Sequence, residues 1–362
     1  MSERASGVRR LLVVTNMWPS PANPVFGGFV SRSVDALRAE GAQVDVVANV
    51  DSRTGVLSSV LKYARLAFRV RRHARGEKYD AVIGHYLYPT AAMARTASRI
   101  TGAPLVLVVH GTDSKSVRRK DPWAWAARRA LHSADLVITA SSALARVVRE
   151  ELGLPAGIPI AAVHVGIDDE AFRPDPSARE RLGVPAEERV ALYVGNLIRP
   201  KGLDVLQAAF EHSGAERLVL VGGGPMAAEL RAWASEVSRD SRCVTLTGRI
   251  DQAEVALWMA AADVLVLPSR NEGLGLVLLE AMACGTPCVA SRVGGIPEIV
   301  DERTGVLVEP GDAEALAGAI ACVLEAGRSS YTDACLQAAR GHGARAKARE
   351  LLAAIDRISA TV

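Results

Sequence analysis

Short apolar runs alternate with helical patterns along nearly the whole chain, and this alternation limits the fold more than any other feature. The runs show no polar–apolar alternation, which is typical of strands buried on both faces of a parallel sheet. Helices between them are the usual connection of parallel strands. The sequence therefore predicts an α/β fold. The predicted strands are 8–15, 44–50, 79–84, 104–109, 135–140 and 160–164 in the first half, and 189–194, 217–221, 243–247, 263–267 and 287–291 in the second.

Helical spacing of apolar residues follows most of these runs. Ser141 stands where a side-chain N-cap is expected, just before an apolar periodic segment. The closing segment again has helical spacing, without a strand after it. The predicted helices are 29–40, 56–74, one after a loop within 85–100, 123–132, 143–151, 177–182, 203–211, 226–237, 252–260, 275–283, 312–326 and 344–358.

A chain of 362 residues is long for a single core, so two domains are expected. A stretch rich in Asp and Pro, residues 165–188, separates two similar series of strands and helices. We predict a first domain of residues 1–167, completed by the closing helix at about 344–362, and a second domain of residues 168–343. Two doubly wound domains in tandem leave a cleft between them, which is a usual place for a ligand.

The composition is that of a globular enzyme, with 49% hydrophobic and 23% charged residues. No apolar run approaches the roughly 18 residues of a membrane span, and the polar N-terminus lacks the features of a signal peptide. We therefore expect a cytoplasmic protein. The five cysteines are an odd number with no histidine at metal-ligand spacing, so buried thiols are expected, without disulfides or a metal site.

Charge is unevenly distributed between the halves. Residues 1–165 contain 23 Lys and Arg against 12 Asp and Glu, whereas residues 166–362 contain 20 against 28. The basic segment 56–78 can contact an anionic membrane or a lipid-linked acceptor, or it can be a solvated basic helix. No nucleic-acid-binding motif accompanies the charge, so nucleic acid is not an expected partner.

The segment 268–300 combines a strand end, a glycine-containing loop and a helix start. Its candidate phosphate-binding residues are Gly273, Leu274, Gly275 and Leu276. Backbone N–H groups at a helix N-terminus have no intrahelical acceptor, and the helix dipole favours an anion there. The carboxyl edge of a parallel sheet is also where α/β proteins bind ligands.

Two glutamates, Glu272 and Glu280, stand on either side of this helix start. A carboxylate beside a phosphate is repelled by it, and so it is better suited to neutral hydroxyl groups. Glu280 could also be an ordinary exposed helix residue, although its neighbours are almost all apolar. A phosphate together with hydroxyls indicates a sugar nucleotide as the ligand.

Three further loops follow strands of the second half. In the loop GNLIRPKG, Gly195 allows close backbone approach, Asn196 is a further donor-binding candidate, and Arg199 and Lys201 suit a diphosphate. The alternative for these two cations is a solvated surface position.

The loops GGGP and TGRID supply Gly223, Arg249 and Ile250. The backbone of TGRID could hydrogen-bond a nucleotide base.

In the first half, two positions after predicted strands are candidates for a ligand site. Gly27 and Gly28 open a helix after the first strand, so their N–H groups could contact a phosphate. His110 ends a strongly apolar strand, and Thr112 and Asp113 follow it with groups that could hold an acceptor. A hydrogen-bonded structural histidine is the alternative for His110.

These motifs, in this order, resemble those of the retaining glycosyltransferases of family 4. The matching segments are VTNMWPSPANPVFGGFV, VVHGTD, ITASS, VHVGIDDEAFRP, GNLIRPKG, VGGGP, LTGRI, PSRNEGLGLVLLEAMACGTPCVAS and GGIPEIV. The resemblance implies a GT-B fold, with two Rossmann-like domains facing a central cleft and a C-terminal helix that crosses back to the first domain. It implies a UDP- or GDP-sugar as co-substrate, no cofactor, and transfer to a glycan, lipid-linked or small-molecule acceptor.

The resemblance also assigns roles. Arg199 and Lys201 would bind the diphosphate, Glu280 the ribose hydroxyls, and Glu272 with the backbone of 273–276 the sugar and phosphates.

In the first domain, Gly28 would approach the phosphates and His110 the transferred sugar. The alternatives are a glycan phosphorylase on the same fold and a non-catalytic sugar-nucleotide-binding protein.

Overall fold

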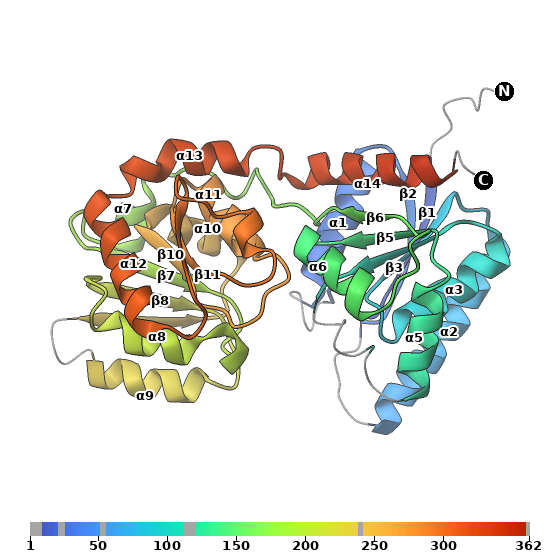
Figure 1. Ribbon diagram of the computed structural model, residues 1–362, viewed down its shortest axis with the longest axis horizontal. Helices are drawn as coiled ribbons and strands as arrows, with labels where there is room; N and C mark the ends of the chain where they lie inside the picture. The colour runs from blue at the N-terminus through green and yellow to red at the C-terminus, as the bar shows by residue number, and fades with distance from the viewer. Residues whose placement is uncertain are drawn as a thin grey trace. The chain divides into compact units, whose positions relative to one another are not determined.

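The chain forms two compact units, Met1–Gly166 with Ala344–Val362, and Ile167–Gly343 (Figure 1). The computed structural model describes residues 9–20, 26–50, 56–111, 117, 121–237 and 242–359, without the side chains of residues 56–60. Each unit contains one six-stranded sheet in which all the pairings are parallel. The predicted α/β fold with two Rossmann-like units is therefore confirmed.

The sheet of the first unit has the strand order β2-β1-β3-β4-β5-β6. Side chains of β1 alternate between two hydrophobic cores: Leu12 and Val14 face one, Leu11 and Val13 the other. Both faces are thus buried, which explains why this strand is apolar throughout. The strands are β1 (Arg10–Thr15), β2 (Gln43–Ala48), β3 (Ala81–His85), β4 (Leu105–Val109), β5 (Leu136–Thr139) and β6 (Ile160–Ala162).

Helices cover both faces of this sheet. On one face, α2 (Val56–Gly76), α3 (Thr90–Thr101) and α5 (Pro122–Leu131) lie in a row, with α3 against both of the others. On the opposite face, α1 (Gly28–Ala39) packs against the closing helix α14 (Ala344–Ser359) (Figure 1).

One predicted helix of this unit differs in form. The segment 143–151 consists of α6 (Ser142–Arg146) followed by a π-helix, η1 (Val147–Glu151), and Ser141 accepts from the N–H of Leu144 as its N-cap.

The sheet of the second unit has the order β12-β11-β10-β7-β8-β9. The strands are β7 (Val190–Val194), β8 (Arg217–Val221), β9 (Cys243–Gly248), β10 (Val264–Leu267), β11 (Cys288–Ser291) and β12 (Gly305–Val308). The α-helices are α7 (Ala178–Leu182), α8 (Leu203–Phe210), α9 (Ala227–Val237), α10 (Gln252–Ala261), α11 (Leu276–Ala283), α12 (Ala313–Ala326) and α13 (Ser329–Ala339). Two 3-10 helices are η2 (Arg199–Lys201) and η3 (Ile296–Glu298).

One strand and one α-helix of this unit, as well as its two 3-10 helices, are absent from the sequence prediction. Strand β12 is only four residues long, and its pairing with β11 is what makes it a strand. Helix α13 buries only Cys335 and Ala339, so it has no clear apolar period. The expected buried thiols are found at Cys284 and Cys288, and Cys335 is buried as well, whereas Cys322 is exposed and Cys243 is half-buried.

Helix α14 completes the core of the first unit, which predicts that its inward side chains stabilise that unit. Ile355 is 1% exposed and packs in the same cluster as Val34 and Leu37 of α1. Ile355→Ala should lower the free energy of unfolding by about 2–5 kcal/mol through lost burial and a new cavity. Urea unfolding measures this change, with exposed Ala353→Ser as the matched control. Equal stability of the two variants would contradict the assigned packing.

Candidate functional site

The strand order of the second unit creates a switch point between β7 and β10. These strands are neighbours, but the chain continues from β7 to one side and from β10 to the other. In doubly wound sheets ligands bind at such a point, at the carboxyl ends of the strands. The loops that follow β7 and β10 contain Arg199, Lys201 and Glu272, so the topology brings together residues about 70 positions apart.

Arg270 joins these two loops. Its backbone N–H donates to the carbonyl of Pro200 (2.9 Å), and its guanidinium donates to the carbonyl of Arg199 (3.1 Å). The same guanidinium makes two hydrogen bonds to Asp204, of 2.6 and 2.8 Å, and these lower the pKa of that carboxyl. Arg270 lies within the PSRNEG motif but is not among the residues predicted from it.

Lys201 and Glu272 form an ion pair at the centre of the site. Their side chains are 21% and 16% exposed, so the pair is mostly shielded from water. Ser269 donates a second hydrogen bond to the same Glu272 oxygen (3.3 Å). Burial and then the negative charge of Glu272 raise the pKa of the nearby Tyr193. Lys201 is therefore held in place before any ligand arrives.

Arg199, the second predicted cation, has a different environment. Its side chain is 77% exposed, and Glu229 lies 4.0 Å from its guanidinium. An exposed pair at this distance contributes little stability. Arg199 is thus positioned by its backbone in η2 while its guanidinium can still move toward a ligand.

Glycines allow these loops to approach one another closely. Gly202 has φ +70°, and a Cβ there would lie 1.9 Å from the carbonyl oxygen of Pro268. Gly294 has φ +54°, and its Cβ would lie 1.8 Å from the carbonyl oxygen of Glu272. Both positions require glycine in order to hold the loop after β10 in place.

The predicted residues after β7 and β8 lie at the same edge of the sheet. Gly195 donates to the carbonyl of Val221 (3.0 Å), and the hydroxyl of Tyr193 donates to the carbonyl of Asn196 (2.9 Å). Gly223 accepts from the N–H of Leu197 (3.1 Å).

The side chain of Arg249 lies against Gly223, within 3.0 Å of where a Cβ would be. Ile250 packs partly into the core of the unit. The loops after β7, β8 and β9 are thus in contact.

Helix α11 begins directly after the loop that holds Glu272. Gly275 is its N-cap, with φ +86°, and provides no side-chain cap. Leu274 and Gly275 are buried, whereas Gly273 and Leu276 are half-buried. The N–H groups of the first turn lack intrahelical acceptors and lie at the positive end of the helix dipole.

Glu280 lies one turn further along α11 and is half-buried. It is therefore not the exposed helix residue that was the alternative.

The first unit has a switch point of its own, between β1 and β3. Gly27 follows β1 with φ +76° and is the N-cap of α1, whose first residue is Gly28. A Cβ on Gly27 would lie 2.6 Å from the backbone of Met17, whereas one on Gly28 would meet nothing within 4 Å. Gly28 thus presents its backbone at an open position.

His110 follows β4 and contacts a second histidine. Its Nε2 is 3.1 Å from Nδ1 of His85, the last residue of β3, and the two rings are stacked. Phe29 and Tyr86 pack around the His110 ring, with centroid distances of 5.0 and 4.6 Å. His85 is not among the predicted site residues, although it also ends a strand. Thr112 and Asp113 lie outside the described residues.

Burial keeps both imidazoles neutral. It lowers the pKa of His85 to about 4, and burial together with His85 lowers the pKa of His110 well below its usual value. One ring nitrogen of the pair must donate and the other accept, so each ring fixes the tautomer of its neighbour.

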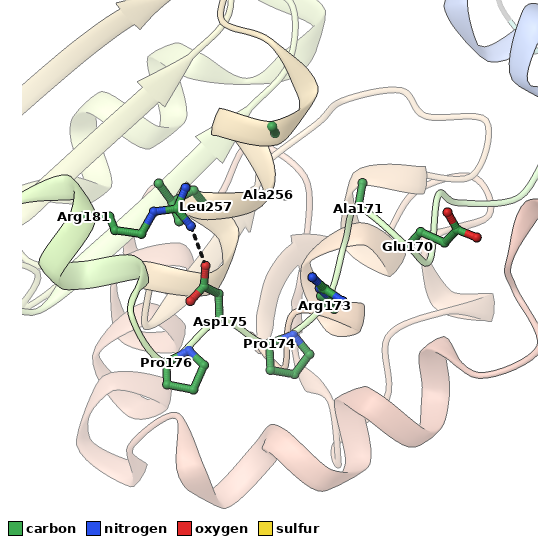
Figure 2. Close-up of a pocket in the computed structure, with 10 residues that line it drawn as sticks. Glu170, Ala171, Arg173, Pro174, Asp175, Pro176, Arg181, Ala256 and Leu257 are labelled. Atoms are coloured by element: carbon green, nitrogen blue, oxygen red, sulfur yellow. Dashed lines mark hydrogen bonds and ion pairs between the residues drawn. The ribbon is translucent and has the colours of Figure 1, made fainter.

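A separate cavity of about 550 Å³ lies elsewhere in the second unit (Figure 2). It is bounded by the segment after Ile167 and by α10, and Arg181 pairs with Asp175 at its wall (2.8 Å). None of the predicted donor residues lines it. The cavity is therefore distinct from the switch point, where the predicted donor residues of the second unit lie.

In the parts of the chain that the structure describes, no three His, Cys, Asp or Glu side chains are grouped as a metal site. Among those same residues, no helix has the length and apolar content needed to cross a membrane.

Two known families match the chain. Residues 28–171 match Glycosyltransferase Family 4, and residues 188–326 match Glycosyl transferases group 1. With the two parallel sheets and the glycine loops at their switch points, these matches define a glycosyltransferase of the GT-B fold. The chain belongs to glycosyltransferase family 4.

Curated relatives agree with this membership. The D-inositol 3-phosphate glycosyltransferase 1 of Catenulispora acidiphila is 33% identical over 73% of this chain and 69% of its own length. The putative teichuronic acid biosynthesis glycosyltransferase TuaC of Bacillus subtilis is 32% identical over 67% of this chain and 60% of its own length. The chain spans about half to two thirds of the length of the curated relatives it matches.

Solved structures share the fold. Sucrose-phosphate synthase from Thermosynechococcus elongatus has a TM-score of 0.78 at 24% identity and covers 98% of this chain and 100% of its own. Anabaena Alr3699/HepE in complex with UDP-glucose has a TM-score of 0.75 at 21% identity, covering 97% and 100%.

Buried His85 predicts a loss of stability in acid. The unfolded imidazole takes up a proton near pH 6.5, whereas folded His85 does so only near pH 4, so stability is lost as pH falls through this window. His85 alone should contribute about 2 kcal/mol of loss between pH 7 and pH 5. Urea unfolding at several pH values measures this slope. His85→Gln should flatten it and exposed His212→Gln should not; equal slopes in both would contradict the assignment.

Proposed function

We propose that the chain transfers a glycosyl group from a nucleoside-diphosphate sugar to an acceptor hydroxyl. The observation that carries this proposal is the Lys201–Glu272 ion pair at a sheet switch point, beside the N-terminus of α11. A cation, a helix N-terminus and a carboxylate in one place match a ligand with phosphates and hydroxyls together.

Charge develops on the diphosphate as the sugar leaves. Lys201, Arg199 and the amides of residues 273–276 would stabilise that charge in the transition state. When Lys201 turns to the phosphates, the Glu272 carboxylate loses a partner and gains the capacity to accept from sugar hydroxyls. We assign Glu280 to the ribose hydroxyls, and the backbone at Gly195, Asn196, Gly223 and Arg249–Ile250 to the rest of the nucleotide.

In the first unit we assign Gly28 to the donor phosphates and His110 to the transferred sugar. A neutral imidazole donates a hydrogen bond to a hydroxyl without the cost of burying a charge. Gly27 holds the turn that presents Gly28, and Thr112 and Asp113 are assigned to the acceptor.

The donor we favour is a UDP-sugar, with a GDP-sugar as the second choice, because the structurally similar HepE binds UDP-glucose. The relatives act, by their names, in teichuronic acid biosynthesis and on D-inositol 3-phosphate. These names support a glycan, lipid-linked or small-molecule hydroxyl as acceptor. The five free thiols suit the reducing cytoplasm, which we propose as the location.

The ion pair predicts the effect of removing either partner. Lys201→Ala should abolish transfer because the leaving diphosphate loses its pre-positioned cation. Glu272→Ala should also abolish transfer, because the sugar hydroxyls lose the carboxylate that accepts their hydrogen bonds. Turnover of the UDP-sugar that the wild type uses measures both. The matched control is Arg217→Ala, which breaks the similarly shielded Arg217–Glu188 pair. Arg217 is the first residue of β8, so this pair lies at the amino edge of the sheet and the site lies at its carboxyl edge. Near-normal turnover in Lys201→Ala or Glu272→Ala would refute the assignment.

Retention of anomeric configuration is the second expected outcome. We propose a same-face displacement in which the departing phosphate accepts the proton of the acceptor hydroxyl. Proton NMR of the first-formed product should show the donor's anomeric configuration. A glycosyl-enzyme trapped on a carboxylate would overturn this mechanism, and a requirement for inorganic phosphate would instead indicate a phosphorylase.

A further inference from the structure

His85 is a buried histidine to which the proposed transfer assigns no role. It is the last residue of β3, pairs in register with Val108 of β4, and is 1% exposed. Alternate residues of a strand share a face of the sheet, so His85 lies on the face of Ile83, where α1 and α14 pack. A buried polar side chain is normally hydrogen-bonded. A partner of His85 is Nε2 of His110, which lies 3.1 Å from its Nδ1.

The backbone directly after His85 is strained. Tyr86 has φ 69° and is the one residue other than glycine with a positive φ in the described part of the chain. This conformation is unfavourable for a bulky side chain and is kept only where the surrounding structure enforces it, often at functional sites. Here it accompanies a tilted contact between Tyr86 and the His110 ring, while Phe29 makes an edge contact with the same ring. The His110 ring is therefore held by three neighbouring side chains.

The protons of the histidine pair allow two arrangements. Both imidazoles are neutral because they are buried, and a neutral imidazole carries one proton, so one ring donates and the other accepts. If Nε2 of His110 donated to His85, Nδ1 of His110 would carry no proton for a ligand. If Nδ1 of His85 donates instead, the proton of His110 lies on Nδ1. The hydrogen bond at one nitrogen of a histidine thus decides what its other nitrogen can do.

We propose that His85 is a positioning residue for the transfer, because its Nδ1 donates to Nε2 of His110 and so keeps the proton of His110 on Nδ1. Nδ1 of His110 then donates to an oxygen of the transferred sugar, while the contacts of Tyr86 and Phe29 hold the ring. His85 acts through His110 and needs no contact with the ligand. This inference rests on the role that the proposed function gives His110.

A neutral partner suits this task better than a carboxylate. A carboxylate would accept from His110 and raise its pKa, which favours the charged imidazolium. Burial lowers the pKa of His85, and burial with His85 lowers the pKa of His110, so no carboxylate of the described residues contributes. Of the titratable groups that line a small cavity with His85, Lys347 pairs with Glu350 (2.8 Å) and Nδ1 of His164 accepts a backbone N–H (3.0 Å). His85 can therefore fix the tautomer of His110 without adding a charge.

The tautomer of His110 in the full chain without donor tests this proposal directly. Nitrogen NMR of the protein with isotope-labelled histidine distinguishes a protonated Nδ1 from a protonated Nε2. The signals that vanish in His110→Gln identify the residue. At neutral pH we expect the proton of His110 on Nδ1. A proton on Nε2, or a charged ring, would overturn the proposal.

Two variants of nearly equal shape separate hydrogen-bond donation from packing. Asn carries an amide nitrogen at the position of Nδ1, whereas Leu has nearly the shape of Asn without a donor. His85→Leu should lower kcat at least about tenfold, because His110 loses the partner that fixes its proton. His85→Asn should keep most of the wild-type kcat. Equal losses in the two variants would mean that His85 only fills space, and the NMR result depends on neither variant folding.

A double variant tells a positioning role from an independent one. If His85 acts through His110, His85→Leu should lower turnover no further in a His110→Gln background. Additive losses would overturn the positioning role. A chain that turns over no UDP- or GDP-sugar would refute the proposed function, whereas the tautomer of His110 would still be measured. A failure of one proposal is therefore distinguishable from a failure of the other.

Discussion

The adjacency of β7 and β10 is the constraint on which the candidate site depends. Parallel strands need crossover connections, so two neighbouring strands can be far apart in sequence while their following loops lie side by side. Arg270 links the two loops by donating hydrogen bonds to the carbonyls of Arg199 and Pro200. Gly202 allows the loops to approach because it leaves room for the carbonyl of Pro268. The sheet order thus brings the loops together, and these backbone contacts hold them.

The two cations of the candidate site differ in exposure and in pairing. Lys201 is shielded and already paired with Glu272, whereas Arg199 is exposed. Moving Lys201 from Glu272 to a phosphate leaves a shielded carboxylate without its cation, which is costly unless hydroxyl groups donate to it. A ligand that offers phosphates and hydroxyls together satisfies both groups, whereas inorganic phosphate satisfies only the lysine. Under the proposed function, the ion pair would therefore favour the whole sugar nucleotide over its parts.

The sequence was informative where local pattern and chemistry coincide. Apolar runs ending at glycine loops located Gly195, Gly223 and Gly273, because a strand end and a glycine turn are both local features. Arg270 and His85 were missed because their roles depend on partners that only the tertiary fold supplies. Strand β12 was missed for a related reason, since four residues become a strand only by pairing with β11.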